Sequence, residues 1–188
     1  MCERCKKFFA SIDHETLLQI SARHIDDRDA LWLMGRVISS FHSTREGVGL
    51  PLGNLTSQLF VNIYMNGFDQ FVKHKLKVKY YVRYADDFVI LSEDRESLNN
   101  VLIVMGDFLK RRLRLNLHPD KVFIKTLASG VDFLGWVNFF DHRVLRAGTK
   151  RRMVRRIDEK ASRETINSYL GMMKYGNGYK STKKIFCN

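Results

Sequence analysis

The order of apolar and polar residues predicts amphipathic helices interrupted by short strands. Asp13 followed by Glu15 to Leu18 is typical of a helix N-cap and first turn. Ala30 to Phe41 repeats apolar residues at the spacing of a second helix. Ser97 to Leu113 has the same period and predicts a longer helix. We therefore expect helices that each bury one face in this part of the chain.

A glycine-rich segment lies between the predicted helix 30–41 and the next apolar stretch. Residues 46–54 contain three glycines and one proline, which predicts a turn-rich loop. Thr56 and Ser57 are expected to cap the helix that follows. The apolar residues of this helix recur at helical spacing, at Leu59, Phe60, Ile63, Tyr64 and Phe68.

An acidic pair interrupts the most strand-like part of the chain. Val78 to Leu91 is rich in β-branched and aromatic residues, and Ala85, Asp86 and Asp87 break it into two strands joined by a tight turn. Adjacent carboxylates repel each other, and Mg²⁺ would offset that repulsion because it prefers carboxylate oxygens. The alternative is an ordinary polar turn, since aspartate is common in turns.

The rest of the chain predicts strands followed by basic helices. Residues 121–126, 131–138 and 143–146 have the composition of short strands. A helix is expected to begin at Lys150–Ile157, and another over Ile166–Lys174. Helices interleaved with antiparallel strands place the chain in the α+β class.

Charge is distributed unevenly along the 188 residues. Residues 1–109 carry 13 Lys and Arg against 14 Asp and Glu, whereas residues 110–188 carry 19 against 6. The net charge of +12 therefore comes from the second region. Clustered positive charge favours a polyanionic partner such as nucleic acid, and a merely solvated basic surface is the alternative.

Cysteine usage and hydropathy favour an intracellular, cytoplasmic protein. Cys2, Cys5 and Cys187 are odd in number, which argues against a disulfide framework. Cys2 and Cys5 have the spacing of zinc ligands, but no second pair completes such a site. No apolar run is long enough to cross a membrane, and no secretory signal opens the chain.

The sequence Tyr84-Ala85-Asp86-Asp87, with its hydrophobic flanks, resembles the metal-binding turn of reverse transcriptases. Upstream, Gly49 to Gln58 resembles motif B of that family, a loop and helix that contact the templating base and the incoming nucleotide. With Leu52 and Ser57-Gln58, this motif most resembles motif B in the enzymes of diversity-generating retroelements. Group II intron and retron enzymes are more distant comparisons. The resemblance implies Asp86 and Asp87 as catalytic metal ligands, and nucleotide contacts at Gly53, Gln58 and Tyr84.

Three later segments match the same family in order. Leu115-Asn116 followed by Lys121 resembles motif D, which implies that Lys121 protonates the leaving pyrophosphate; an exposed lysine at the start of a strand is the alternative. Phe133 to Trp136 resembles the primer grip, which implies primer contacts at Gly135 and Trp136, with core packing as the alternative for the apolar residues. The basic segment 150–163 resembles the first thumb helix, whose phosphate contacts would come from Arg151, Arg152, Arg155 and Arg156.

The beginning of the chain departs from the family pattern. Lys6 to His14 resembles the end of motif A, in which Phe9 is the aromatic steric gate that excludes a ribose 2′-hydroxyl. The family has a metal-bridging aspartate five residues before the gate, where this chain has Arg4. A guanidinium repels metal ions. Asp13 is the nearest acid, and we assign it to helix capping instead.

The resemblance implies a polymerase palm at residues 1–147 and the start of a basic helical thumb at 148–188. We expect a truncated chain that begins inside motif A and lacks the fingers, because the later motifs are intact. The intact parent would be an RNA-directed DNA polymerase that adds dNTPs by two-metal phosphoryl transfer, with Mg²⁺ or alternatively Mn²⁺. Its partners would be an RNA template with a DNA primer or an RNA–DNA duplex, a retroelement accessory protein, and no membrane.

Two alternatives stay open at this point. One is a catalytically dead remnant of a retroelement that still binds nucleic acid, because the motif A aspartate is missing. The other is a palm polymerase that makes RNA, because palm folds serve several nucleotidyl transfers. An aromatic gate at Phe9 argues against the second.

Overall fold

The structure is a computed structural model that describes residues 2–5, 7–159 and 162–176. The side chains of residues 2–4 lie outside this description, and so does the Cys187 thiol. The chain divides into two compact units, residues 1–124 and 125–188, which are described separately below. The division into a palm at 1–147 and a thumb at 148–188 stays a prediction.

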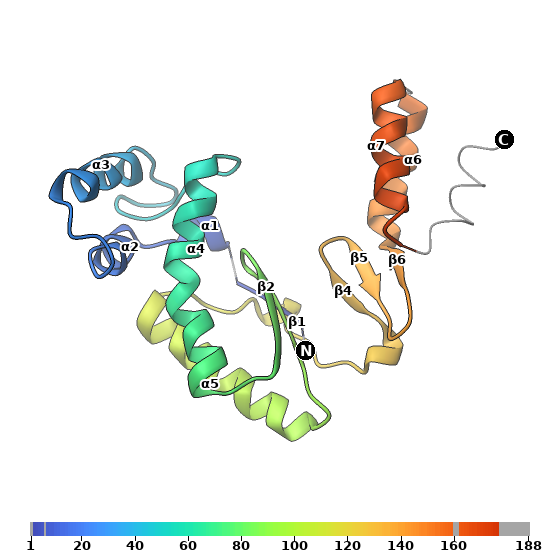
Figure 1. The fold of residues 1–188 in the computed structure, drawn as a ribbon, viewed down its shortest axis with the longest axis horizontal. Helices are drawn as coiled ribbons and strands as arrows, with labels where there is room; N and C mark the ends of the chain where they lie inside the picture. The colour runs from blue at the N-terminus through green and yellow to red at the C-terminus, as the bar shows by residue number, and fades with distance from the viewer. Residues whose placement is uncertain (1, 6, 160–161, 177–188) are drawn as a thin grey trace. The chain divides into compact units, whose positions relative to one another are not determined.

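A three-stranded antiparallel sheet forms the centre of the first unit (Figure 1). Strand β3 (Asp87–Leu91) lies between β1 (Cys2–Arg4) and β2 (Tyr80–Tyr84). The register places Arg4 opposite Asp87 on one side and Tyr84 opposite Asp87 on the other. Phe88 and Ile90 are buried, whereas Tyr80, Val82 and Tyr84 are exposed, so the sheet has one covered face and one open face.

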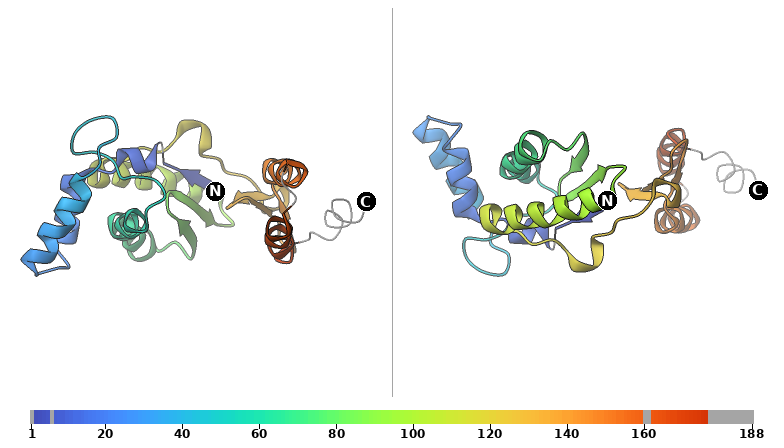
Figure 2. Two further views of the ribbon diagram at one scale, coloured as in Figure 1. Left: turned by 90° about the horizontal axis from the view of Figure 1, so that it is seen from above. Right: turned by 90° about the horizontal axis from the view of Figure 1, so that it is seen from below.

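Helices cover the Phe88 face of this sheet. Phe68 of α4 (Leu55–Gln70) lies 5.4 Å from Phe88 and 5.9 Å from Phe108 of α5 (Arg95–Leu113), measured between ring centroids. Both helices therefore share one core with β3. Helix α2 (His14–Ser21) packs against α4 and against α3 (Arg28–Ser39), and the short α1 (Phe8–Ser11) precedes it (Figure 2).

Aspartate caps fix the start of three helices. The side chains of Asp13, Asp27 and Asp94 accept hydrogen bonds from backbone amides in the first turns of α2, α3 and α5. The cap expected at Asp13 is confirmed. The cap expected at Thr56 and Ser57 is wrong, because α4 begins one residue after Asn54 and both residues lie inside its first turn.

The second unit pairs a small sheet with two helices. Strands β4 (Val131–Phe133), β5 (Trp136–Asn138) and β6 (Arg143–Leu145) are antiparallel in chain order. Helices α6 (Ala147–Glu159) and α7 (Arg163–Met173) follow and pack against each other (Figure 2). The expected strand at 131–138 is instead a hairpin, because Leu134 and Gly135 form a turn with positive φ at both residues.

The predicted α+β class is confirmed by the described residues, which contain α-helices and two antiparallel sheets. The strand expected at 121–126 is wrong: a 3₁₀ turn ends at Lys121, and no strand follows before Val131. Within the described ranges, no helix combines the length and apolar character needed to cross a bilayer.

Candidate active site

The acidic turn lies at the tip of the β2–β3 hairpin. Ala85 and Asp86 connect the strands, and Asp87 begins β3. Tyr84 is 62% exposed and pairs with Asp87 across the hairpin, so these two positions belong to the open face of the sheet. Asp86 and Asp87 are half-buried. The structure thus brings the two predicted metal ligands and the predicted nucleotide contact Tyr84 together.

A cluster on the covered face supports this turn. The Arg83 guanidinium donates to both carboxylate oxygens of Asp69 on α4, with Nε–Oδ1 at 2.8 Å and Nη2–Oδ2 at 2.6 Å. Its third nitrogen, Nη1, donates to the Ala85 carbonyl at 2.9 Å. The Tyr81 hydroxyl donates to Asp69 Oδ1 at 2.7 Å. Sequence reasoning missed these residues, although a charged residue in phase with the buried face of a strand signals a buried partner.

Position 4 lies beside the acidic turn. The backbone of Arg4 is the antiparallel partner of Asp87, so β1 places this sequence position next to the carboxylate pair. Cys5 then forms an isolated antiparallel bridge with Leu117, which ties the chain after α5 to the end of β1. Lys121 is exposed at the end of the 3₁₀ turn that lies against β1. The register therefore places position 4, where the family resemblance predicts an aspartate, beside the acidic turn.

The predicted gate residue is joined to the predicted nucleotide loop. Leu50 N donates to the Phe9 carbonyl at 2.8 Å, and Gly49 N donates to the Ile12 carbonyl at 2.8 Å. Gly49 has φ of +113°, and a Cβ there would lie 2.6 Å from the Ser43 side chain. Glycine is therefore required for this close approach. Phe9 is half-buried and packs edge-on to Phe8, while Gly53 in the loop and Gln58 on α4 are exposed.

Asp13 belongs to a buried network instead of the acidic turn. Its carboxylate accepts from the Thr16 amide and hydroxyl and pairs with Arg114 Nη1 at 2.8 Å. Burial alone would raise the pKa of Asp13, but the Thr16 hydrogen bonds and the Arg114 guanidinium outweigh burial and lower it. Burial raises the pKa of Tyr64 to about 12, so its hydroxyl stays protonated and donates to the Leu113 carbonyl. The capping role expected for Asp13 is confirmed.

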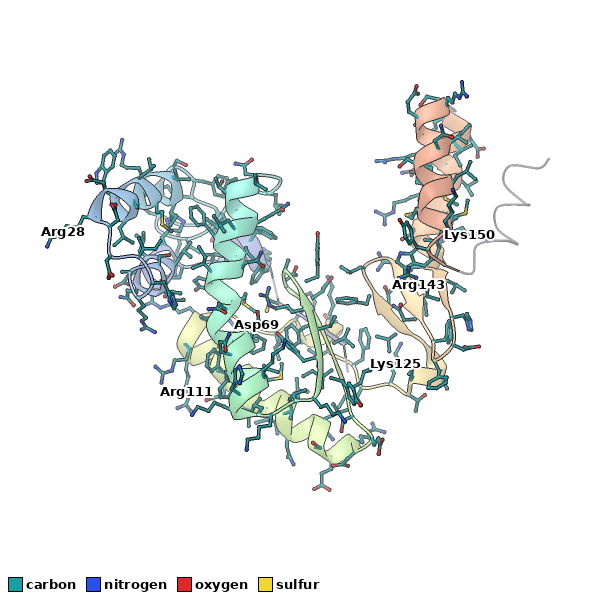
Figure 3. The ribbon with its side chains drawn as sticks, viewed as in Figure 1. Arg28, Asp69, Arg111, Lys125, Arg143 and Lys150 are labelled. Carbon is teal, nitrogen blue, oxygen red and sulfur yellow. The ribbon has the colours of Figure 1, made fainter. Side chains whose placement is uncertain are left out.

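Gly135 and Trp136 lie in the second unit, at the β4–β5 turn. Gly135 has φ of +84°, and a Cβ there would approach Thr149 Oγ1 at 3.3 Å. Trp136 is half-buried, and the Arg143 guanidinium lies 4.9 Å from its ring centroid. Arg143 also donates to the Tyr175 carbonyl, so it links β6 to the end of α7 (Figure 3). These contacts explain Trp136 as a packing residue and leave its role at a primer as a prediction.

The basic helix α6 buries one side and exposes its arginines. Met153 is fully buried, whereas the four arginines predicted to bind phosphate are exposed. Arg155 lies 3.8 Å from Glu159, an exposed pair that contributes little to stability. The positive surface of α6 includes the exposed Arg151, Arg152, Arg155 and Arg156.

The carboxylates of this chain fit a magnesium site only in part. Mg²⁺ is held in proteins by one or two carboxylates, with water and substrate phosphates in its other positions, and Asp86 and Asp87 can supply two. A two-ion site needs a further bridging carboxylate, and position 4 carries arginine. In the described part of the chain, no group of three or more His, Cys, Asp or Glu could hold a metal ion.

A comparison with known families identifies the family to which the chain belongs. The family model described as reverse transcriptase (RNA-dependent DNA polymerase) matches residues 5–138. The chain belongs to the reverse transcriptase family. The matched segment includes Phe9, the glycine loop, the acidic turn and the β4–β5 hairpin of this reverse transcriptase chain.

Individual relatives are distant and longer. Protein YkfC of Escherichia coli is 24% identical over 208 residues, covering 88% of this chain and 52% of YkfC. Group II intron-encoded protein LtrA of Lactococcus lactis is 23% identical over 237 residues, covering 89% of this chain and 38% of LtrA. The putative COX1/OXI3 intron 2 protein of Saccharomyces cerevisiae is 22% identical over 193 residues, covering 69% of this chain and 22% of the yeast protein.

The alignments cover only part of each relative. The chain spans between about a fifth and a half of the length of these relatives. The alignments to YkfC and LtrA exceed the 188 residues of the chain, so both relatives contain segments that it does not have. The closer resemblance to diversity-generating retroelements stays a prediction.

Proposed function

We propose that this chain derives from an RNA-directed DNA polymerase that extends a DNA primer on an RNA template. The observation that carries the proposal is the β2–β3 turn, where Asp86 and Asp87 lie beside exposed Tyr84 on the open face of a palm-like sheet. Membership in the reverse transcriptase family supports it. The dNTP would lie between this turn and the loop joined to Phe9.

The residues have separate tasks in this proposal. Asp86 and Asp87 would hold Mg²⁺, or Mn²⁺ in its place, and the ion would neutralise charge on the dNTP phosphates. Phe9 would exclude a 2′-hydroxyl, and Gly53 and Gln58 would face the nucleotide. Lys121 would deliver a proton to the leaving pyrophosphate. The α6 arginines would bind the phosphates of the template–primer duplex without reading its sequence.

A second candidate is a nucleic-acid-binding protein without catalysis, and the register of β1 favours it. Position 4 pairs with Asp87, where a bridging carboxylate would complete the site, yet the chain has Arg4. A cation at this position opposes metal binding by Asp86 and Asp87. On this candidate, α6 binds RNA or DNA and the acidic turn no longer performs chemistry.

Primer extension on an RNA template distinguishes the two candidates. The unchanged chain is expected to give little or no product, and Arg4→Asp, tested in a chain to which an upstream fingers segment has been restored, is expected to produce Mg²⁺-dependent extension. A matched control combines Arg4→Asp with Asp86→Asn, which must again remove the product. If Arg4→Asp binds template–primer with unchanged affinity but yields no product, the non-catalytic candidate is correct for this chain.

Nucleotide choice tests the role of Phe9. With Arg4→Asp, incorporation of dNTP should exceed that of rNTP, and Phe9→Ala should narrow the difference because the aromatic ring no longer fills the space beside the ribose. Phe8 is buried and offers a control, since Phe8→Leu should leave the preference unchanged. Equal use of both nucleotides by the Arg4→Asp chain would instead favour RNA synthesis.

A further inference from the structure

A buried guanidinium lies directly behind the acidic turn. The Arg83 side chain is 8% exposed and Asp69 is 25% exposed, so their pairing is largely removed from water. Burial lowers the pKa of Arg83, but the hydrogen bonds and charge of Asp69 outweigh burial and raise it. Arg83 therefore stays charged, and each of its three nitrogens has a fixed acceptor.

Arg83 lies on the covered face of the sheet, opposite the open face on which Tyr84 and Asp87 lie. It pairs with Phe88 across the hairpin, whereas Tyr84 pairs with Asp87 on the open face. Its partner Asp69 comes from α4, the helix that packs on that covered side (Figure 3). Neither Arg83 nor Asp69 is thus placed to touch a nucleotide bound at Asp86 and Asp87.

The hydrogen bond from Arg83 to the turn is accepted by Ala85, the turn residue whose backbone is strained. Ala85 has φ of +51°, a left-handed conformation that non-glycine residues rarely adopt and that persists when surrounding contacts hold it. Arg83 Nη1 donates to the carbonyl of this same residue. That carbonyl belongs to the peptide group joining Ala85 to Asp86, so the bond fixes the backbone from which the Asp86 carboxylate projects.

Tyr81 forms a further hydrogen bond with Asp69, the carboxylate that pairs with Arg83. Its hydroxyl donates to Asp69 Oδ1, the oxygen that also accepts from Arg83 Nε. Burial, followed by the hydrogen bond and charge of Asp69, raises the pKa of Tyr81 far above its ordinary value. Tyr81 therefore stays a donor, and Asp69 is held from two positions on the same face of β2, residues 81 and 83.

We propose that Asp69 and Arg83 are positioning residues that hold the Ala85–Asp86 peptide in the conformation needed by the acidic turn. The catalytic consequence rests on the proposed function, whereas the conformational consequence does not. The two can therefore be tested separately on the same chain.

Nuclear magnetic resonance of the full chain tests the conformational part. In Arg83→Lys, which keeps the charge but loses the forked geometry, the Ala85 Cα and Cβ shifts and its HN–Hα coupling should leave their left-handed values. The Asp86 amide should also gain motion. Two cavities of about 450 and 420 Å³ adjoin Asp69 and Arg83, so water can fill the space left by a changed side chain.

Asp107→Asn is the matched control, because it removes the exposed Asp107–Arg111 pair on α5. It should leave the Ala85 and Asp86 signals unchanged. Asp69→Asn should reproduce the effect of Arg83→Lys, and if Asp69→Asn does not fold, Arg83→Lys decides alone. The proposal is overturned if Ala85 keeps its left-handed signals in folded Arg83→Lys.

Kinetics test the catalytic part in the Arg4→Asp background. Arg83→Lys should lower kcat on the order of 100-fold, because small displacements of reacting groups cost rate, while KM for dNTP changes little. An equal fall in kcat for Asp107→Asn would overturn the positioning role. If the Arg4→Asp chain makes no product, the proposed function fails, and the resonance measurement still decides the conformational part.

Discussion

The hairpin β2–β3 and the hairpin β4–β5 both reverse direction in two residues, but different side chains surround the two turns. In β2–β3, Ala85 adopts positive φ and its carbonyl accepts from the buried Arg83 guanidinium. In β4–β5, Leu134 and Gly135 both adopt positive φ, a pattern that matches the natural twist of paired strands. The ion pair nearby, Arg146–Asp132, has side chains 43% and 36% exposed.

This difference separates a turn held by its own backbone geometry from a turn held by buried charge. Glycine removes steric strain at one position of the second turn without help from neighbours. The first turn has alanine, not glycine, at its position of positive φ, so its conformation needs support from side chains outside the two turn residues. Arg83 supplies that support through its bond to the Ala85 carbonyl, and Asp69 holds Arg83 in place.

The largest expected effect is on stability when the buried pair loses its acid. Asp69→Ala leaves Arg83 buried without its carboxylate and should lower the unfolding free energy by about 3 kcal/mol. Asp132→Ala removes the exposed counterpart and should cost no more than about 1 kcal/mol. Urea unfolding of both variants measures the difference. Equal losses of unfolding free energy would show that the buried ion pair beside β2–β3 stabilises the fold no more than the exposed pair beside β4–β5.

The next effect concerns affinity for nucleic acid. We expect this affinity to come from the second unit, which contains the β4–β5 hairpin and α6. Changing the four exposed α6 arginines to glutamine should weaken binding to an RNA–DNA duplex on the order of 100-fold at low salt and flatten the salt dependence. Filter binding across a salt series measures both. A control with Lys110→Gln, Arg111→Gln and Arg112→Gln removes charge from α5 instead. An equal loss in this control would contradict the role assigned to α6.

A smaller effect is expected from exchanging the turn residues. Gly135→Ala should lower the unfolding free energy by about 1–2 kcal/mol, because its φ is positive and Thr149 lies close. Ala85→Gly should change it by less than about 1 kcal/mol, since glycine accepts the same φ. In the Ala85→Gly background, Arg83→Lys should perturb the turn less. Thermal and urea unfolding with a double-mutant cycle measure this coupling.

Local signals in the sequence predicted the parts of the fold that depend on neighbouring residues. The Asp13 cap is read from residues within one helical turn, and the acidic hairpin from a single run of strand-forming residues. The two-residue turn at Leu134 and Gly135 was missed, although glycine within a strand-like run was its signal. The strand expected at 121–126 was wrong because a 3₁₀ turn occupies its first residue and Phe123 forms a single β-bridge instead of a strand.

The support of the acidic turn could not be predicted in the same way. Asp69 and Arg83 are 14 residues apart and belong to a helix and a strand, so no periodic pattern connects them. Their pairing depends on how α4 crosses the sheet, which is a tertiary property. Sequence reasoning did assign Asp86 and Asp87 through the family resemblance, and their metal binding stays a prediction.

Buried charge is also expected to support the first unit beyond its hairpin, at Asp13. The folded-state pKa of Asp13 lies below its ordinary value of 3.8, since Thr16 and Arg114 outweigh the effect of burial. Its carboxylate therefore stabilises the fold above about pH 4, and this contribution is lost as the pH falls through the folded-state pKa. Asp13→Asn, which can still cap α2, should be less stable than wild type at pH 7 and should lose less stability on acidification.

Urea unfolding at pH 7, 5 and 3 measures this effect, which should be about 1 kcal/mol. Asp27→Asn is the matched control, because Asp27 caps α3 through the Ala30 amide from an exposed position. If both variants show the same pH dependence, Asp13 acts only as a cap. A smaller acid loss in Asp13→Asn alone means that the buried Asp13 carboxylate stabilises the first unit through its charge, which the exposed Arg114 guanidinium pairs.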